Sequence, residues 1–135
     1  SYDGSLYALD AANGSKRWDF PMGSPIFSSP AVVNGNVFVG GQNGGIIAVN
    51  ATNGALIWRF DAGDFVSSSP AVVGGTVYVG SQDSNLYALA AADGTERWRV
   101  ETDDVVYSSP AVADGVVYVG NQDGCLYAVP GSETV

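Results

Sequence analysis

Clustered serines are the first residues in this sequence that could do chemistry, as nucleophiles of an acyl-transfer site. They occur at Ser28–Ser29, Ser67–Ser69 and Ser108–Ser109, and the chain contains no histidine. A serine hydroxyl attacks a substrate only when a neighbouring base takes its proton. Because the serines also recur at a spacing of 40 residues, the pattern favours a structural role over catalysis.

Carboxylates are the second group, because they could bind a cation such as Ca²⁺. Calcium needs several oxygen ligands that converge from different loops. Most carboxylates here instead fall at predicted turns and have amide or neutral counterparts in sister repeats, as do Asp83, Asp93, Asp114 and Asp123. Asp103 and Asp104 are adjacent, but neighbours in an extended loop point apart. We therefore expect a solvated acidic tip there and no metal site.

A thiol and three recurrent tyrosines complete the chemically interesting residues. Cys125 is the only cysteine, and nothing basic adjoins it in sequence, so we expect a small neutral residue and not a reactive thiol. The tyrosines alternate with leucines in short apolar runs, which predicts blade-core residues and not a stacking platform. They are Tyr7, Tyr87 and Tyr127.

The balance of charge is strongly acidic and restricts the partners. The formal net charge is −9, the sequence pI is about 4.1, and Lys16 is the only lysine. Such a surface repels nucleic-acid phosphates and anionic lipid headgroups. No apolar run reaches the roughly 18 residues that a membrane helix needs. We therefore expect neither a nucleic-acid partner nor direct membrane insertion.

The elements that must position these residues follow an internal repeat of 40 residues. Trp18, Trp58 and Trp98 keep this step without insertion. The same step relates further glycines and glutamines: Gly40, Gly80, Gly120, Gln42, Gln82 and Gln122. A repeat of this length is typical of a propeller or a solenoid.

Each repeat contains four short runs of β-forming residues. In the middle repeat they are Ser69–Val73, Thr76–Gly80, Leu86–Leu89 and Arg97–Val100. Asn34–Gly35 connects the first two runs of its repeat and is typical of a type I′ hairpin. Four antiparallel strands joined by tight turns predict an all-β fold, a β-propeller with one blade per repeat. The shorter rungs of a solenoid fit this pattern less well.

The repeat divides the chain into four predicted units: a half-blade at 1–26, blades at 27–66 and 67–106, and an incomplete blade at 107–135. The first unit holds only a third and a fourth strand, and the last unit lacks its fourth strand. About three repeats cannot close a ring, so both ends carry unpaired edges. The ring is completed either by oligomerisation, in which one copy finishes the blade of another, or by blades outside this sequence.

The skeleton Ala-x-Asp-x-x-x-Gly-x-x-x-Trp, which begins at Ala8 and ends at Trp18, resembles the PQQ-like (quinoprotein and BamB-type) β-propeller repeat family. Asn50 and Ala90 replace the aspartate in the next two copies. The resemblance implies that the motif tryptophan packs between neighbouring blades. The expected blade-docking residues are Trp18, Trp58, Trp98, Gly14, Gly54, Gly94, Ala8, Ala48, Ala88 and Asp10.

Quinoprotein dehydrogenases of this family combine the repeat with a Ca²⁺ site, a catalytic aspartate, a ring of adjacent cysteines and a tryptophan floor for the quinone. This chain has neither adjacent cysteines nor grouped glutamates. We therefore expect no catalytic residue, no cofactor and no metal. The family implies a non-catalytic scaffold or protein-interaction module. Two alternatives stay open, a self-assembling repeat protein (closed ring or filament) and a fragment of a PQQ-dependent dehydrogenase.

The same resemblance leads to expectations about partners and location. The expected partners are a second copy of the chain, with a dimer favoured, and other proteins. The expected location is extracytoplasmic: periplasmic, secreted or at the cell surface. Fold alone does not decide among these functions.

Overall fold

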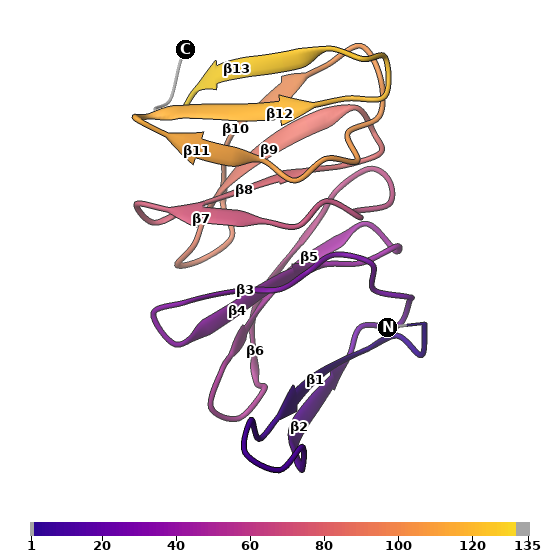
Figure 1. The fold of residues 1–135 in the computed structure, drawn as a ribbon, viewed down its shortest axis with the longest axis vertical. Helices are drawn as coiled ribbons and strands as arrows, with labels where there is room; N and C mark the ends of the chain where they lie inside the picture. Colours follow the sequence, from indigo (N-terminus) through magenta and orange to yellow (C-terminus); the bar gives the residue numbers. More distant parts are fainter. Residues whose placement is uncertain (1, 132–135) are drawn as a thin grey trace.

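The computed structural model describes residues 2–131, which form four antiparallel sheets arranged side by side along an open arc (Figure 1). The arrangement confirms the expected all-β propeller. No helix in this range is long and apolar enough to cross a membrane. Residues 1 and 132–135, the outer limits of the first and last predicted units, lie outside the described residues.

Two complete sheets stand in the middle of the chain. The first consists of β3 (Ala31–Val33), β4 (Asn36–Gly40), β5 (Gly45–Asn50) and β6 (Leu56–Asp61). The second consists of β7 (Ala71–Val73), β8 (Thr76–Gly80), β9 (Asn85–Ala90) and β10 (Glu96–Glu101). In each sheet every strand pairs with its neighbour in sequence, as a meander of hairpins requires.

Two smaller sheets stand at the ends. The first contains β1 (Ser5–Leu9) and β2 (Lys16–Pro21), and the last contains β11 (Ala111–Ala113), β12 (Val116–Gly120) and β13 (Leu126–Pro130). By the repeat, β1 and β2 correspond to third and fourth strands, whereas β11 to β13 correspond to first, second and third strands. The predicted unit limits fall in the connections between sheets and remain a prediction.

The turns adopt the backbone conformations that their residues favour. Asn34 and Gly35 have φ values of 52° and 78°, and two successive positive φ angles define the expected type I′ hairpin. The same turn recurs before β8 and β12. The hairpin between third and fourth strands is closed differently, because the Asn50 carbonyl accepts a hydrogen bond from Gly54 N (2.8 Å).

The first strand of each blade begins later than predicted. The sequence suggested a strand from Ser69, but β7 begins at Ala71. Pro70 has no N–H to donate to a ladder. The preceding serines use their hydroxyls as acceptors for backbone N–H groups, so Ser68 Oγ accepts from Gly80 N at 3.1 Å. Hydrogen bonds that the serine hydroxyls accept from distant backbone N–H groups take the place of strand pairing here.

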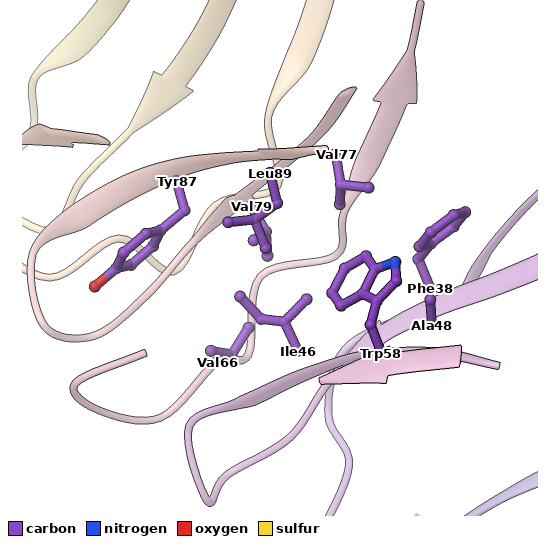
Figure 2. Packing of buried hydrophobic residues seen from close by; sticks show 9 residues of the cluster. All are labelled: Phe38, Ile46, Ala48, Trp58, Val66, Val77, Val79, Tyr87 and Leu89. Atoms are coloured by element: carbon purple, nitrogen blue, oxygen red, sulfur yellow. The ribbon is translucent and has the colours of Figure 1, made fainter. Parts of the chain in front are cut away.

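The core lies between the sheets and not within one of them. Each inter-sheet cluster joins one face of a blade to the opposite face of the next blade. Figure 2 shows the central cluster, in which Ile46 and Trp58 of one blade face Val79 and Leu89 of the next. Because the inner blades are covered on both faces, adjacent residues such as Ile46 and Ile47 are both fully buried. This explains the continuous apolar runs in the sequence.

The tyrosine expectation holds for the middle of the chain and was wrong at its beginning. Tyr87 is buried within the central cluster. Tyr7 lies on the outer face of the first sheet and is 43% exposed, because no sheet precedes β1 and β2 among the described residues. Tyr127 is half-buried at the other end.

Candidate functional site

The carboxylates at turns accept hydrogen bonds from nearby backbone N–H groups. Asp93 Oδ1 accepts from Thr95 N at 3.0 Å, and Asp104 Oδ1 accepts from Val105 N at 2.8 Å. These bonds belong to the turn chemistry that the sequence indicated. Within residues 2–131 no group of three or more His, Cys, Asp or Glu side chains could hold a metal ion.

The paired serines connect neighbouring blades, a role that their sequence pattern alone does not predict. Ser29 N donates to Ser69 Oγ at 2.7 Å, and Ser69 N donates to Ser109 Oγ at 2.9 Å. The ladder runs along the ends of the innermost strands, where β3 and β11 each contact β7. The recurrence of Ser-Ser-Pro at every step of 40 residues was the available signal.

The motif tryptophans reach from one blade to the next. Trp18 Nε1 donates to Ala51 O at 2.9 Å, and Trp58 Nε1 donates to Ala91 O at 2.8 Å. Both acceptors belong to the turn that precedes the fourth strand of the following blade. Each indole N–H therefore has the partner that a buried tryptophan requires.

The motif glycines lie directly beneath these rings. A Cβ atom on Gly54 would lie 2.6 Å from the Trp18 ring, and one on Gly94 would lie 2.6 Å from the Trp58 ring. Gly14 occupies the same turn in the first sheet and has nothing within 4 Å of its Cβ position, because no sheet precedes it among the described residues. The structure thus brings Trp18 to Gly54 and Trp58 to Gly94.

The remaining expected docking residues have other neighbours. The motif alanines lie opposite the tryptophan of their own sheet, which gives the register pairs Ala8 with Trp18, Ala48 with Trp58 and Ala88 with Trp98. Asp10 caps its own turn by accepting from Ala12 N at 2.8 Å and lies 3.2 Å from Arg17 Nη2. Trp98 packs against Tyr78 of its own sheet. The contribution of these residues to blade docking remains a prediction.

A second close contact, between a blade and the connection that leaves it, is not evident from the sequence. A Cβ atom on Gly40 would lie 2.2 Å from Val66 Cγ1, and one on Gly80 would lie 2.3 Å from Val106 Cγ1. Both valines lie in the connection to the next blade and are fully buried. The signal was present in the sequence, since Gly40 and Gly80, like Val66 and Val106, are 40 residues apart. Only the fold shows that they touch.

An ionisable cluster surrounds Tyr87 at the outer end of the central interface. The Tyr87 hydroxyl donates to Asp83 Oδ2, which also accepts from Gly63 N at 3.0 Å. The Arg99 guanidinium lies 5.0 Å from the centre of the Tyr87 ring, and Phe60 of the preceding blade meets that ring edge to face. Asp83 therefore connects the turn between β8 and β9 to the loop that leaves the previous blade.

The environment shifts the pKa of both partners of this hydrogen bond. Burial and the hydrogen bond to the Asp83 carboxylate raise the pKa of Tyr87 to about 12. Burial on its own would raise the pKa of Asp83, but hydrogen bonds from Tyr87, Asn85 and Gly63 outweigh it and hold that pKa below its usual value. Both shifts favour a neutral phenol beside an ionised carboxylate.

We expect the free energy of unfolding to fall at acid pH, because the Asp83 carboxylate becomes protonated. A carboxyl whose pKa is lower in the folded than in the unfolded chain stabilises the fold above its unfolded pKa of about 3.9. That contribution is lost as the pH falls through the lower folded value. Asp83→Asn, which matches Asn43 of the sister repeat, should therefore show a shallower loss of stability below pH ~4. Urea unfolding across the acid range measures this.

At high pH the stability should fall as the pH rises, because Tyr87 loses its proton. A separate variant, Tyr87→Phe, is the control for this effect. A phenol whose pKa is raised to about 12 contributes stability below its unfolded pKa of about 10, and this is lost as the pH rises through the folded value. The absorbance of the phenolates should show a late-titrating component near pH 12 that is missing in Tyr87→Phe. If the free energy of unfolding fell equally steeply below pH ~4 in wild type and in Asp83→Asn, the result would contradict the assigned role of the carboxylate.

The thiol of Cys125 is exposed beside a carboxylate. A hydrogen bond and the negative charge of Asp123 raise the pKa of this thiol. A raised pKa lowers the fraction of thiolate, which is the reactive form. This agrees with the expectation of an unreactive cysteine.

Large apolar side chains are exposed on the two end sheets. Leu126 and Tyr118 on the last sheet are 75% and 39% exposed, whereas Leu86 and Tyr78, their counterparts one repeat earlier, are buried. On the first sheet Leu9 is 57% exposed, and its counterpart Leu89 is fully buried. These two surfaces, defined by Leu126 with Tyr118 and by Tyr7 with Leu9, are the candidate site and are called the end faces below.

Comparison with known proteins gives one family and several similar folds. The family model for PQQ_2, described as outer membrane protein assembly factor BamB, matches residues 2–133. BamB from Moraxella catarrhalis is similar in structure, with a TM-score of 0.86 and 24% identity over 97% of this chain. The quinohemoprotein alcohol dehydrogenase ADHIIG from Pseudomonas putida HK5 gives a TM-score of 0.84 and 20% identity over 99% of this chain.

A computationally designed protein, Ika4, is also similar, with a TM-score of 0.85 and 16% identity over 95% of this chain and 80% of its own. This chain spans 45% of the BamB chain and 30% of the dehydrogenase chain. No curated protein matched the sequence. At these identities the similar structures show the β-propeller fold alone.

Proposed function

This chain belongs to the PQQ_2 family of the outer membrane protein assembly factor BamB, and on this premise we propose that it is a non-catalytic β-propeller scaffold that binds proteins. The proposed partners are a second copy of the chain, with a dimer favoured, and other proteins. The proposed location is extracytoplasmic, by analogy with the family description.

The exposure of the end faces is the observation that carries this proposal. Leu126 is 75% exposed although its counterpart Leu86 is fully buried by a neighbouring blade. Contiguous exposed apolar residues on a folded protein usually mark a surface that contacts another protein. The residue types on the end faces are those that the same repeat buries against a blade elsewhere in the chain.

The polar groups that could serve catalysis are engaged in the fold. The serine hydroxyls accept backbone N–H groups within and between blades. The carboxylates described above cap turns, and the described residues contain no cluster of ligands suited to Ca²⁺. The residues present therefore do not fit the quinone and calcium site of a PQQ-dependent dehydrogenase, which is the alternative that the structural similarity to ADHIIG suggests.

A cofactor titration separates the scaffold from that alternative. Adding the purified chain to PQQ with Ca²⁺ should leave the absorption spectrum of the free quinone unchanged, because no described group of residues supplies converging carboxylates. A quinoprotein dehydrogenase that binds PQQ serves as the positive control. A saturable spectral shift with this chain would contradict the non-catalytic proposal and restore the dehydrogenase alternative.

A further inference from the structure

A cavity lies between the two complete blades, where the β3–β4 and β7–β8 hairpins meet the turn that precedes β10. We propose that this cavity binds a small organic carboxylate with an apolar body, and that Arg97 anchors the carboxylate group. Both walls belong to complete sheets, so the site is separate from the end faces. It goes beyond the proposed scaffold function and does not depend on it.

The cavity has the size and the lining of a small-molecule site. Its volume is about 480 Å³, which lies within the range of pockets that hold small ligands. Apolar side chains come from both blades, among them Val33, Phe38 and Val72. Among the described residues, Arg97 is the only charged one that lines the cavity. An apolar wall with a single cation favours a ligand that carries one negative charge at one end.

Arg97 is the extra residue of a β-bulge in the fourth strand. The register of β10 against β9 slips between Glu96 and Trp98, so Arg97 has no partner on β9. A bulge of this kind turns a side chain out of the regular alternation of the strand. In the preceding blade the same bulge holds Ile57. The fold therefore does not require a cation at this position.

Arg97 is also the one cation within residues 2–131 that forms no ion pair. Its counterpart in the first sheet is Arg17, whose Nη2 lies 3.2 Å from Asp10 Oδ2. By the repeat, Ala90 stands in the third copy where Asp10 stands in the first. The third copy thus keeps the cation and lacks the carboxylate that would neutralise it, and a ligand carboxylate can take that place.

Two nearby carboxylates do not replace this partner. Asp93 Oδ1 accepts hydrogen bonds from the backbone N and the hydroxyl of Thr95, at 3.0 Å and 2.6 Å. These bonds and, more weakly, the charge of Arg97 hold the pKa of Asp93 below its usual value. Asp114 lines a smaller groove of about 380 Å³ between β7 and β11, which Arg97 also borders. An anion is therefore favoured in the cavity between the complete blades, whose lining contains no carboxylate.

The two kinds of lining define the class of ligand. A guanidinium binds a planar carboxylate through two parallel N–H···O hydrogen bonds. An exposed ion pair alone contributes little to affinity, so an apolar body packed against Val33 and Phe38 must supply much of the rest. The side chains of Asn34 and Asn36 also line the cavity and can donate to or accept from a polar group on that body. The class is an aromatic or branched monocarboxylic acid.

An NMR titration of the isotope-labelled chain with phenylpropanoate tests the site. The backbone amide signals of Asn34, Gly75 and Ala92, which line the cavity, should shift saturably. Phenylpropanamide, which has the same body without the charge, should bind about tenfold or more weakly, and so should acetate, which has the charge without the body. Equal affinities for acid and amide would overturn the proposal. The absence of a saturable shift, or a shift confined to Val112 and Ala113 in the smaller groove, would overturn it as well.

Substitutions at two positions identify the anchor. Arg97→Gln, on an exposed side chain, should weaken binding of the acid about tenfold or more and leave binding of the amide unchanged. Ala90→Asp restores the carboxylate that Asp10 supplies to Arg17, so it should compete with the acid and weaken its binding. Ala90→Asn, which matches Asn50 of the second copy, is the uncharged control and should bind the acid like wild type. Wild-type affinity in Arg97→Gln, or equal affinities in the two Ala90 variants, would overturn the role of Arg97.

Discussion

Trp58→Ala is expected to lower the free energy of unfolding by about 3–5 kcal/mol, the usual range for truncating a buried aromatic residue. Trp58 is buried in the central cluster between two complete blades. Its indole N–H donates to Ala91 O of the following blade at 2.8 Å. The substitution removes the ring from the interface and leaves that carbonyl without its donor. Because small domains are stable by only about 5–15 kcal/mol, the loss should be large enough to unfold part of the population near body temperature.

Urea unfolding followed by fluorescence and circular dichroism measures this loss. Trp58→Phe keeps most of the apolar area and removes the hydrogen bond, so its cost should be smaller than that of the alanine variant. Trp18→Ala is the matched control on a half-buried tryptophan at the end of the chain, and it should also cost less. Melting and unfolding curves that coincide for wild type and Trp58→Ala would reject the docking role of the motif tryptophan.

Gly94→Ala should be the second most damaging substitution, although it adds only one methyl group. The added Cβ would lie 2.6 Å from the Trp58 ring, and overpacking of this kind costs about 1–3 kcal/mol. Gly94 also has a φ of 77°, and the left-handed region costs an L-residue a further ~1–2 kcal/mol. The overpacking cost and the backbone cost add at Gly94, because this residue both turns the chain and lies beneath the Trp58 ring.

Gly14→Ala separates the backbone cost from the overpacking cost. Gly14 has a φ of 76° and nothing within 4 Å of its Cβ position, so its substitution carries the backbone cost alone. The difference between the two variants in urea unfolding should be about 1–3 kcal/mol. In a Trp58→Ala background Gly94→Ala should fall to the cost of Gly14→Ala, because the ring is gone. Equal costs for Gly94→Ala and Gly14→Ala in the wild-type background would show that the ring contact is unimportant.

Most of the fold could be predicted from the sequence because the repeat presents the same information several times. Turn pairs such as Asn34–Gly35 require positive φ angles in each copy, so strand order and hairpin type follow from local chemistry. The alternation of apolar runs with these turns gave the four-stranded blade. The start of the first strand was misplaced at Ser69, because the serine hydroxyls had partners that only the folded chain brings near.

The contacts that join a blade to its connections and neighbours were less accessible to sequence reasoning. The packing of Gly40 against Val66 joins residues 26 positions apart, and nothing local indicates which glycine meets which valine. The exposure of Tyr7 and Leu126 was also not evident, since their repeat equivalents are buried. A residue on an end sheet has the same sequence signature as one in the middle, and only the presence of a neighbouring sheet decides its environment.

The mass of the chain in solution, measured by light scattering over a concentration series, tests the central claim most directly. The claim is that the end faces bind protein, with a second copy as the first partner. The account predicts a mass of at least twice the 13.9 kDa of one chain, with Tyr118→Asp shifted towards a single chain. A wild-type mass of 13.9 kDa at every concentration would contradict it, because the exposed leucines and tyrosines of the end sheets would then have no affinity for their own repeat.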